Sequence, residues 1–146
     1  MKIYLDACCL NRPFDDQSQV RIHLESESIL QIMEFVKKGN LTWMKSDILE
    51  YEIDRIEDIE KRNKIISFFK YSSKTIEIND EIISISKSYE KLGFGAMDSI
   101  HIASAISAKI DVFLTTDDKL EKIGKKNHKK IGIMIDNPIN WIQILL

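Results

Sequence analysis

Residues 95–117 read GAMDSIHIASAISAKIDVFLTTD and contain the elements that decide the fold. Small and apolar side chains cover most faces of a helix over Met97–Ala108, which predicts a helix at the centre of the molecule. The β-branched and aromatic run Val112–Thr115 predicts a buried strand, and Asp117 follows it. A buried helix followed directly by a buried strand is typical of an α/β protein.

The alternation of strands and helices extends along the whole chain. The predicted strands are Lys2–Leu5, Leu41–Lys45, Thr75–Ile78, Val112–Thr115 and Ile131–Ile135. The predicted helices are Ser18–Lys38, one from Asp47 with Ser46 as N-cap, Glu57–Tyr71, Asp80–Leu92 ended by Gly93, Met97–Ala108, Asp117–Ile123 and one opened by Pro138. The segment Asn11–Asp16 is predicted to be a loop. No linker or repeat divides the chain, so we expect one domain, residues 1–146, around a parallel sheet.

The composition excludes several classes of protein. Hydrophobic residues make up 44% and charged residues 30%, with five Gly and two Pro, which is typical of a globular protein and not of a disordered or fibrous one. The two cysteines, Cys8 and Cys9, are adjacent, a spacing that suits neither a disulfide framework nor a zinc site. The start MKIYLDACCL is too short and wrongly flanked for a signal peptide, and no run approaches the ~20 apolar residues of a membrane span. We therefore expect a cytoplasmic protein with no membrane contact.

The net charge of −2 is uninformative, but its distribution is uneven. Residues 50–60 hold six acidic side chains and one Arg, and residues 119–130 hold six lysines and His128. A nucleic-acid enzyme needs both an acidic metal pocket and a basic rim for phosphates, and this segregation permits both. Two solvated helix faces are the alternative explanation.

Two aspartates follow predicted strands, Asp6 after the first and Asp117 after the fourth. Ligand sites in open parallel sheets lie at the carboxyl ends of strands, where the strand order reverses. Carboxylates that meet there repel, so one must take up a proton or a cation must neutralise them. Asp98 begins the central helix and is either a site residue or a helix-capping residue. Glu52 lies in the acidic run and is either a site residue or a solvated helix residue.

Four clustered carboxylates without the His or Cys spacing of a zinc site select a hard cation. Mg²⁺ and Mn²⁺ prefer oxygen ligands, and Mg²⁺ commonly bridges carboxylates to substrate phosphates. Such an ion lowers the pKa of a bound water and stabilises charge on a phosphate group. Phosphodiester hydrolysis is the reaction that this set of residues suits best.

Four segments of the sequence together resemble the PIN-domain family. They are KIYLDACCL, SDILEYEI, GAMDSIHIASAI and DVFLTTDDKL, which occur in the family's order and span nearly the whole chain. The resemblance assigns the acidic site residues to Asp6, Glu52, Asp98 and Asp117, with Glu50 and Asp118 as rivals for the second and fourth positions.

The resemblance also implies a fold and an activity. It implies a PIN-like three-layer α/β sandwich with a five-stranded parallel sheet of order 3-2-1-4-5. It implies a metal-dependent endoribonuclease that uses Mg²⁺ or Mn²⁺, similar to the VapC toxin of a VapBC pair, with an RNA substrate, an antitoxin partner and a homodimeric state. The alternatives are a catalytically silent PIN-like module that binds RNA or protein, and a haloacid-dehalogenase-like enzyme. The latter needs an acid two residues after its nucleophile, where this chain has Cys8.

Five further residues near the expected site have open roles. Cys8 stands where the family often has a hydroxyl or Asn residue, and a thiol is a weak substitute for either. Arg12 either holds a substrate phosphate or is a loop residue in solvent. His101, one turn after Asp98, either supports the site or is a core histidine with its hydrogen bonds satisfied. Thr115 and Thr116 are candidates for orienting Asp117 by hydrogen bonds.

Overall fold

Five short parallel strands form one sheet at the centre of the computed structural model, which describes residues 1–146. They are β1 (Lys2–Leu5), β2 (Thr42–Ser46), β3 (Lys74–Ile76), β4 (Val112–Leu114) and β5 (Met134–Asp136). The spatial order is β3-β2-β1-β4-β5, and every pairing is parallel, which confirms the predicted topology. The strand order reverses between β1 and β4, so their carboxyl ends mark the position where ligand sites form in open sheets.

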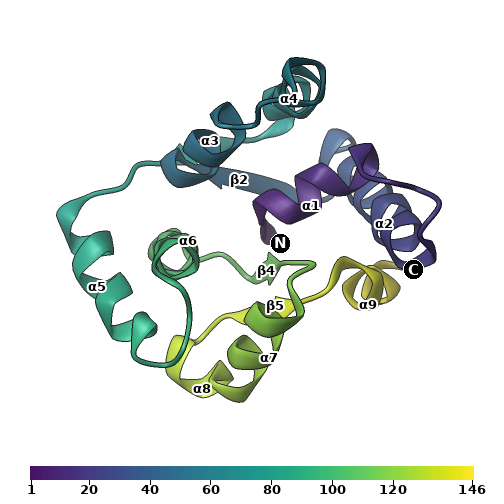
Figure 1. The fold of residues 1–146 in the computed structure, drawn as a ribbon. Helices are drawn as coiled ribbons and strands as arrows, with labels where there is room; N and C mark the ends of the chain where they lie inside the picture. Colours follow the sequence, from purple (N-terminus) through teal and green to yellow (C-terminus); the bar gives the residue numbers. More distant parts are fainter.

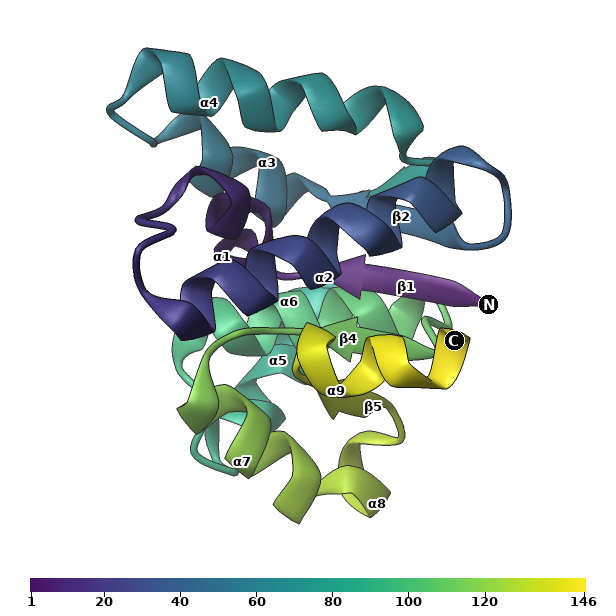
Figure 2. The ribbon, with the colours of Figure 1, turned by 90° about the vertical axis from the view of Figure 1, so that its right-hand side faces the viewer.

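Helices cover both faces of this sheet (Figure 1). The α-helices are α1 (Ala7–Asn11), α2 (Val20–Lys37), α3 (Asp47–Asp54), α4 (Ile59–Ile66), α5 (Asp80–Glu90), α6 (Ala96–Ser107), α7 (Asp118–Lys126), α8 (His128–Ile131) and α9 (Pro138–Ile142). Three short 3₁₀ helices are Arg12–Phe14, Ser67–Tyr71 and Gln143–Leu145. Helices α1, α2 and α9 lie on one side of the sheet and α5 to α8 on the other, so the molecule is a three-layer sandwich, as predicted (Figures 1 and 2).

Each face of the sheet has its own hydrophobic core. Side chains alternate along a strand, so Ile3 and Leu5 of β1 join the core under α2, whereas Tyr4 joins the core under α6. Trp43 and Trp141 are fully buried in the first core, and the Tyr4 ring stacks on Phe113 in the second, with 5.1 Å between ring centroids. Because β1 is covered on both faces, its end and the residues that follow it are held rigidly.

The fifth strand differs from the prediction. Residues 131–135 were expected to form it, but Ile131 ends α8 and the strand begins at Met134. Gly132 ends the helix with a left-handed backbone (φ 71°), which a residue with a side chain rarely adopts, and the chain then turns into β5. Gly124 lets α7 pack on this strand, because a Cβ at that position would lie 2.5 Å from the Cδ1 of Ile135.

The predicted loop Asn11–Asp16 is also largely helical. Asn11 ends α1, and Arg12–Phe14 form a 3₁₀ turn with Pro13 in its first positions. Helices this short have no apolar periodicity for a sequence pattern to detect. None of the helices has both the length and the apolar composition needed to cross a membrane.

Candidate functional site

Asp6 occupies the turn between β1 and α1, at the carboxyl end of the central strand. Its Oδ1 accepts a hydrogen bond from the Ala7 N–H (2.8 Å) and so caps α1. Its Oδ2 accepts one from the Thr115 hydroxyl (2.9 Å) and a longer one from the Cys8 thiol (3.4 Å). The residue is only 7% exposed, and this burial raises the pKa of Asp6, although the His101 charge and the Thr115 hydroxyl oppose the increase.

Asp98 lies half-buried in the first turn of α6 and accepts no hydrogen bond from the protein. The N-cap position of α6 belongs to Gly95, so Asp98 does not cap its helix, which removes one of the two predicted roles. Burial, followed by the charges of Asp6 and Asp117, raises the pKa of Asp98 to about 6. The charge of His101 opposes these effects only in part, and no cation of the protein forms an ion pair with Asp98.

The two rivals for the fourth acidic position have different partners. Asp117 follows β4 and caps α7, because its Oδ1 accepts hydrogen bonds from the N–H groups of Lys119 (3.0 Å) and Leu120 (3.2 Å). It shares the lining of a cavity of about 250 Å³ with Asp98. Asp118 is 71% exposed, and both of its oxygens accept hydrogen bonds from Arg21, at 2.6 and 2.7 Å.

The two glutamates of α3 also have different partners. Glu50 forms an ion pair with Lys45, whose ammonium group also contacts the Thr75 hydroxyl. Glu52 instead contacts the Nε2 of His101, a buried side chain on α6 one turn after Asp98. The contacts thus place Glu52, and not Glu50, beside the helix that carries Asp98.

A chain of buried polar side chains continues behind Glu52. The Nδ1 of His101 lies 2.6 Å from the Tyr4 hydroxyl, which in turn lies 2.6 Å from the Ser46 hydroxyl. Ser46 accepts a hydrogen bond from the Leu49 N–H and is the N-cap of α3, as predicted. Burial alone would lower the pKa of His101, but the Glu52 carboxylate and the charge of Asp6 raise it above its usual value.

The sequence did not point to Tyr4 as part of the site. Tyr4 is fully buried inside an apolar strand, and its pattern is that of an ordinary core residue. The only available signal was its polar end, because a buried Tyr hydroxyl usually has a hydrogen-bond partner. His101 is satisfied on both nitrogens, yet one of its partners is a predicted site residue, so both of its predicted descriptions hold in part.

The charges of the other three acids act on Asp98, but the four carboxylates do not form a closed set of metal ligands. Asp6, Glu52 and Asp117 all contribute to the raised pKa of Asp98. No three His, Cys, Asp or Glu side chains converge closely enough to hold a metal ion between them. The donor set still fits Mg²⁺ or Mn²⁺, because these ions take oxygen ligands and Mg²⁺ usually needs only one or two carboxylates besides water and substrate.

Two buried hydroxyl groups beside these acids have no hydrogen-bond partner, Ser99 next to Asp98 and Thr116 next to Asp117. An unpartnered buried hydroxyl costs free energy, and such groups are rare in folded proteins. Both hydroxyls adjoin an acid in sequence, and ordered water or another group outside the protein is needed to satisfy them.

Arg12 differs from the predictions made for it, whereas Cys8 makes the weak hydrogen bonds expected of a thiol. Arg12 is 23% exposed and pairs with Asp15 (2.9 Å) and Glu25 (2.8 Å), so it is neither a loop residue in solvent nor a free cation for a phosphate. The Cys8 thiol accepts a hydrogen bond from the Thr116 N–H (3.3 Å), in addition to its contact with Asp6. Cys8 thus links the turns that carry Asp6 and Asp117, which a weak hydrogen-bonding group can do.

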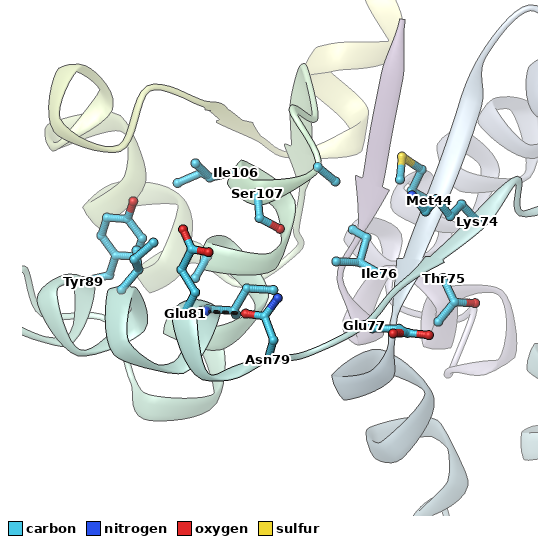
Figure 3. A pocket seen from close by; sticks show the side chains of 14 residues that line it. Met44, Lys74, Thr75, Ile76, Glu77, Asn79, Glu81, Tyr89, Ile106 and Ser107 are labelled. Atoms are coloured by element: carbon cyan, nitrogen blue, oxygen red, sulfur yellow. Dashed lines mark hydrogen bonds between the residues drawn. The ribbon is translucent and has the colours of Figure 1, made fainter.

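A larger cavity of about 660 Å³ lies away from the acids, between α5, α6 and the edge strand β3 (Figure 3). Apolar side chains such as Ile76 and Ile106 line it, with Glu77, Asn79 and Glu81 nearby. None of the four predicted site residues is among its lining residues. Its size alone does not make it the functional site. The one lining residue with a perturbed pKa is Tyr89, and burial alone raises that pKa, whereas the interacting acids and His101 lie elsewhere.

Comparisons with known proteins agree with this arrangement. A sequence model of the PIN domain family matches residues 3–126. No curated protein matches the chain in a sequence search. Similar solved structures include VapBC2 from Rickettsia felis bound to a promoter DNA fragment (TM-score 0.60, 16% identity, 94% of this chain and 98% of that one). Others are FitAcB from Neisseria gonorrhoeae (0.59, 15%, 93% and 97%) and VapBC-1 from nontypeable Haemophilus influenzae (0.58, 15%, 94% and 98%).

Proposed function

Because the chain belongs to the PIN domain family, we propose that it is a metal-dependent endoribonuclease that hydrolyses RNA phosphodiester bonds with Mg²⁺ or Mn²⁺. In this proposal Asp6, Asp98 and Asp117 hold the metal ion, directly or through water, and Glu52 binds it or positions the attacking water. The sequence pattern, the end of the sheet at which these residues lie and the family membership support the same assignment.

The observation that carries the proposal is incomplete compensation of charge, because the charge of His101 only partly offsets the effects that raise the pKa values of Asp6 and Asp98. Asp6, Asp98 and Asp117 form no ion pair, and Asp98 has a pKa of about 6 because of burial and like charges. A protein that keeps such carboxylates together loses stability, unless a cation neutralises them during function. A bound divalent ion would lower the pKa of a water molecule and stabilise charge on the phosphate.

The rivals are less suitable ligands in this structure. Glu50 and Asp118 are already paired with Lys45 and Arg21, so a metal ion would have to displace a bound cation. Glu52 contacts only His101, and one oxygen of Asp117 accepts no hydrogen bond. These contacts favour Glu52 and Asp117 as the second and fourth acids.

Lysines on α7 support an RNA substrate. Lys119 lines the same cavity as Asp98 and Asp117, and Lys122 and Lys126 follow at helical spacing on one face of α7. All three are exposed and unpaired, whereas Lys125 pairs with Glu121 and Asp136. A row of free cations that begins at the acidic cavity suits the phosphates of a single strand.

The test is cleavage of single-stranded RNA by purified protein, with Mn²⁺ or Mg²⁺ and with an EDTA control. Asp6→Asn and Asp98→Asn should each reduce the rate at least about a hundredfold, because a metal ion contributes several kcal/mol to transition-state stabilisation. Asp80→Asn is the matched control, since Asp80 is in the first turn of α5 as Asp98 is in the first turn of α6.

Metal-independent cleavage, or full activity in either site variant, would contradict the proposal. Wild-type protein that binds RNA or protein but never cleaves would favour the alternative of a catalytically silent PIN-like module. Calorimetric titration with Mn²⁺ separates the two outcomes, because the enzyme requires binding that weakens in Asp98→Asn.

We also propose an antitoxin partner and a homodimeric state, as in a VapBC-type pair. Support for the partner comes from similar structures that are VapBC complexes. Co-expression with the neighbouring reading frame, followed by light scattering on the purified material, tests both. A monomer that copurifies with no small neighbouring protein would contradict this part of the proposal.

A further inference from the structure

A second cluster of charged residues lies beside the proposed site, on the α2 side of the sheet. Its centre is Glu25, a fully buried glutamate. Glu25 accepts hydrogen bonds from the Arg12 Nε (2.8 Å), the Arg21 Nε (3.3 Å) and the Asn137 side-chain amide (2.6 Å). These donors come from the turn after α1, from α2 itself and from the turn after β5, so Glu25 joins its own helix to the preceding turn and to a turn far along the chain.

Arg21 extends this cluster to the turn that carries Asp117. While its Nε binds Glu25, its two terminal nitrogens bind both oxygens of Asp118, and Nη2 also donates to the Thr116 carbonyl (3.2 Å). Arg21 thus contacts the residues on each side of Asp117 but not Asp117 itself. The planar guanidinium is suited to this, because its donors lie in a fixed fork.

Exposed ion pairs usually contribute little, and the Arg21–Asp118 pair is partly exposed (51% and 71%). Two features distinguish it from an ordinary surface pair. Its geometry is bidentate, and its arginine is anchored to a buried carboxylate rather than free to move. Exposed ion pairs are most effective when they are bidentate or belong to a network, and this one is both.

We infer that Arg21 is a positioning residue that fixes the Asp117 carboxylate in the proposed metal site by clamping Thr116 and Asp118 against Glu25. This inference rests on the proposed function for its consequence in catalysis. The geometric part does not, because it concerns only the turn between β4 and α7. Residues that orient metal ligands typically affect metal affinity or activity about 10- to 100-fold.

The first measurement uses the metal-free protein. The Lys119 and Leu120 N–H groups donate to Asp117 Oδ1, so amide hydrogen exchange reports whether the turn is held. We expect Arg21→Ala to accelerate exchange at these two amides at least about tenfold, and Asp118→Ala to do so to a smaller extent. Arg55→Ala is the matched control, because the side chain of Arg55, which follows α3, contacts Tyr51 and none of the residues of the cluster. Unchanged exchange at both amides in both variants would overturn the inference.

The second measurement is Mn²⁺ affinity by calorimetry together with the RNA cleavage rate. Arg21→Ala should weaken Mn²⁺ binding on the order of tenfold and lower kcat more than it changes KM. Arg21→Lys should recover little of either, because an ammonium group cannot bind both oxygens of Asp118. If Arg21→Ala lowers only the melting temperature and leaves Mn²⁺ affinity unchanged, Arg21 has a merely structural role and the inference is wrong.

These measurements also separate this inference from the proposed function. If the wild-type protein neither binds Mn²⁺ nor cleaves RNA, the proposed function fails while amide exchange still tests the clamp. Should Arg21→Ala fail to fold, Asp118→Ala remains, since it removes an exposed carboxylate and leaves the Arg21–Glu25 contact in place.

Discussion

Two carboxylates of this protein, Glu25 and Asp98, differ in the hydrogen bonds and charges that surround them. Glu25 is fully buried, and two arginines and an asparagine donate to it. Asp98 is half-buried, accepts no hydrogen bond and lies within the field of three other acids. Burial of a charge is costly unless it is paired. The protein pairs the first carboxylate directly, whereas the charge of His101 offsets the penalty at the second only in part.

The contrast separates a structural charge from a functional one. The fold contains the donors needed to compensate a buried acid, as the Glu25 cluster demonstrates. At Asp98 the one opposing positive charge is that of His101, which contacts a different acid, Glu52. We therefore interpret the incomplete compensation at Asp98 as a requirement for an external cation, and the predictions below test each side of this comparison.

The largest expected effect on stability comes from removing the buried carboxylate of Glu25. Glu25→Ala should lower the free energy of unfolding by about 3 kcal/mol, because it leaves two arginines and an amide without their shared acceptor. Glu34→Ala, on the exposed face of the same helix, should change it by less than about 1 kcal/mol. Urea denaturation of both variants gives the comparison, and equal losses would show that Glu25 is not a structural centre.

A smaller effect is expected from the chain that holds Glu52. Tyr4→Phe keeps the ring stacked on Phe113 but leaves the buried Ser46 hydroxyl and His101 Nδ1 without their partner, which should cost about 1–3 kcal/mol of stability. It should also reduce RNA cleavage about tenfold if His101 orients Glu52. Tyr51→Phe, on the exposed side of α3, is the control for loss of a tyrosine hydroxyl. Wild-type cleavage by Tyr4→Phe would remove this chain from the site.

The sequence was sufficient to single out the three aspartates Asp6, Asp98 and Asp117 as candidate site residues. Asp6 and Asp117 follow apolar strands, so the pattern places both at the carboxyl edge of a parallel sheet, whereas Asp98, in the first turn of a helix, was assigned to the site by the family resemblance. The strand order and the sandwich followed from the resemblance and are confirmed. Local patterns and family motifs were enough because each of these residues is fixed by the element next to it.

The buried carboxylate of Glu25 and its hydrogen-bond partners were not predictable in the same way. Glu25 lies in an ordinary helical pattern, and its partners Arg12 and Asn137 are 13 and 112 residues away. Only the packing of α2 against the turn after β5 brings them together, and no local pattern records that contact. For the same reason the pairing of Arg12 with Asp15 and Glu25 was not predicted, and the expectation of an arginine free in solvent was wrong.

The smallest predicted effect is the change in stability when the Asp98 carboxylate is removed. Asp98 has a pKa of about 6 in the folded protein, above its ordinary value near 4, so the native state binds more protons than the unfolded state between these values. The resulting penalty is absent below about pH 4 and fully present above about pH 6. Asp98→Asn should therefore stabilise the metal-free protein by about 1 kcal/mol at pH 7, after allowance for solvent screening, and by nothing at pH 4.

Melting curves at the two pH values, with Asp80→Asn as control, measure this difference. Mn²⁺ should raise the melting temperature of the wild-type protein more than that of Asp98→Asn, since a ligand stabilises only the state that binds it. One substitution would then abolish cleavage while increasing stability, as expected of a carboxylate kept for function at the expense of the fold. A loss of stability at pH 7 would instead show that Asp98 is compensated like Glu25, and the distinction between the two carboxylates would fail.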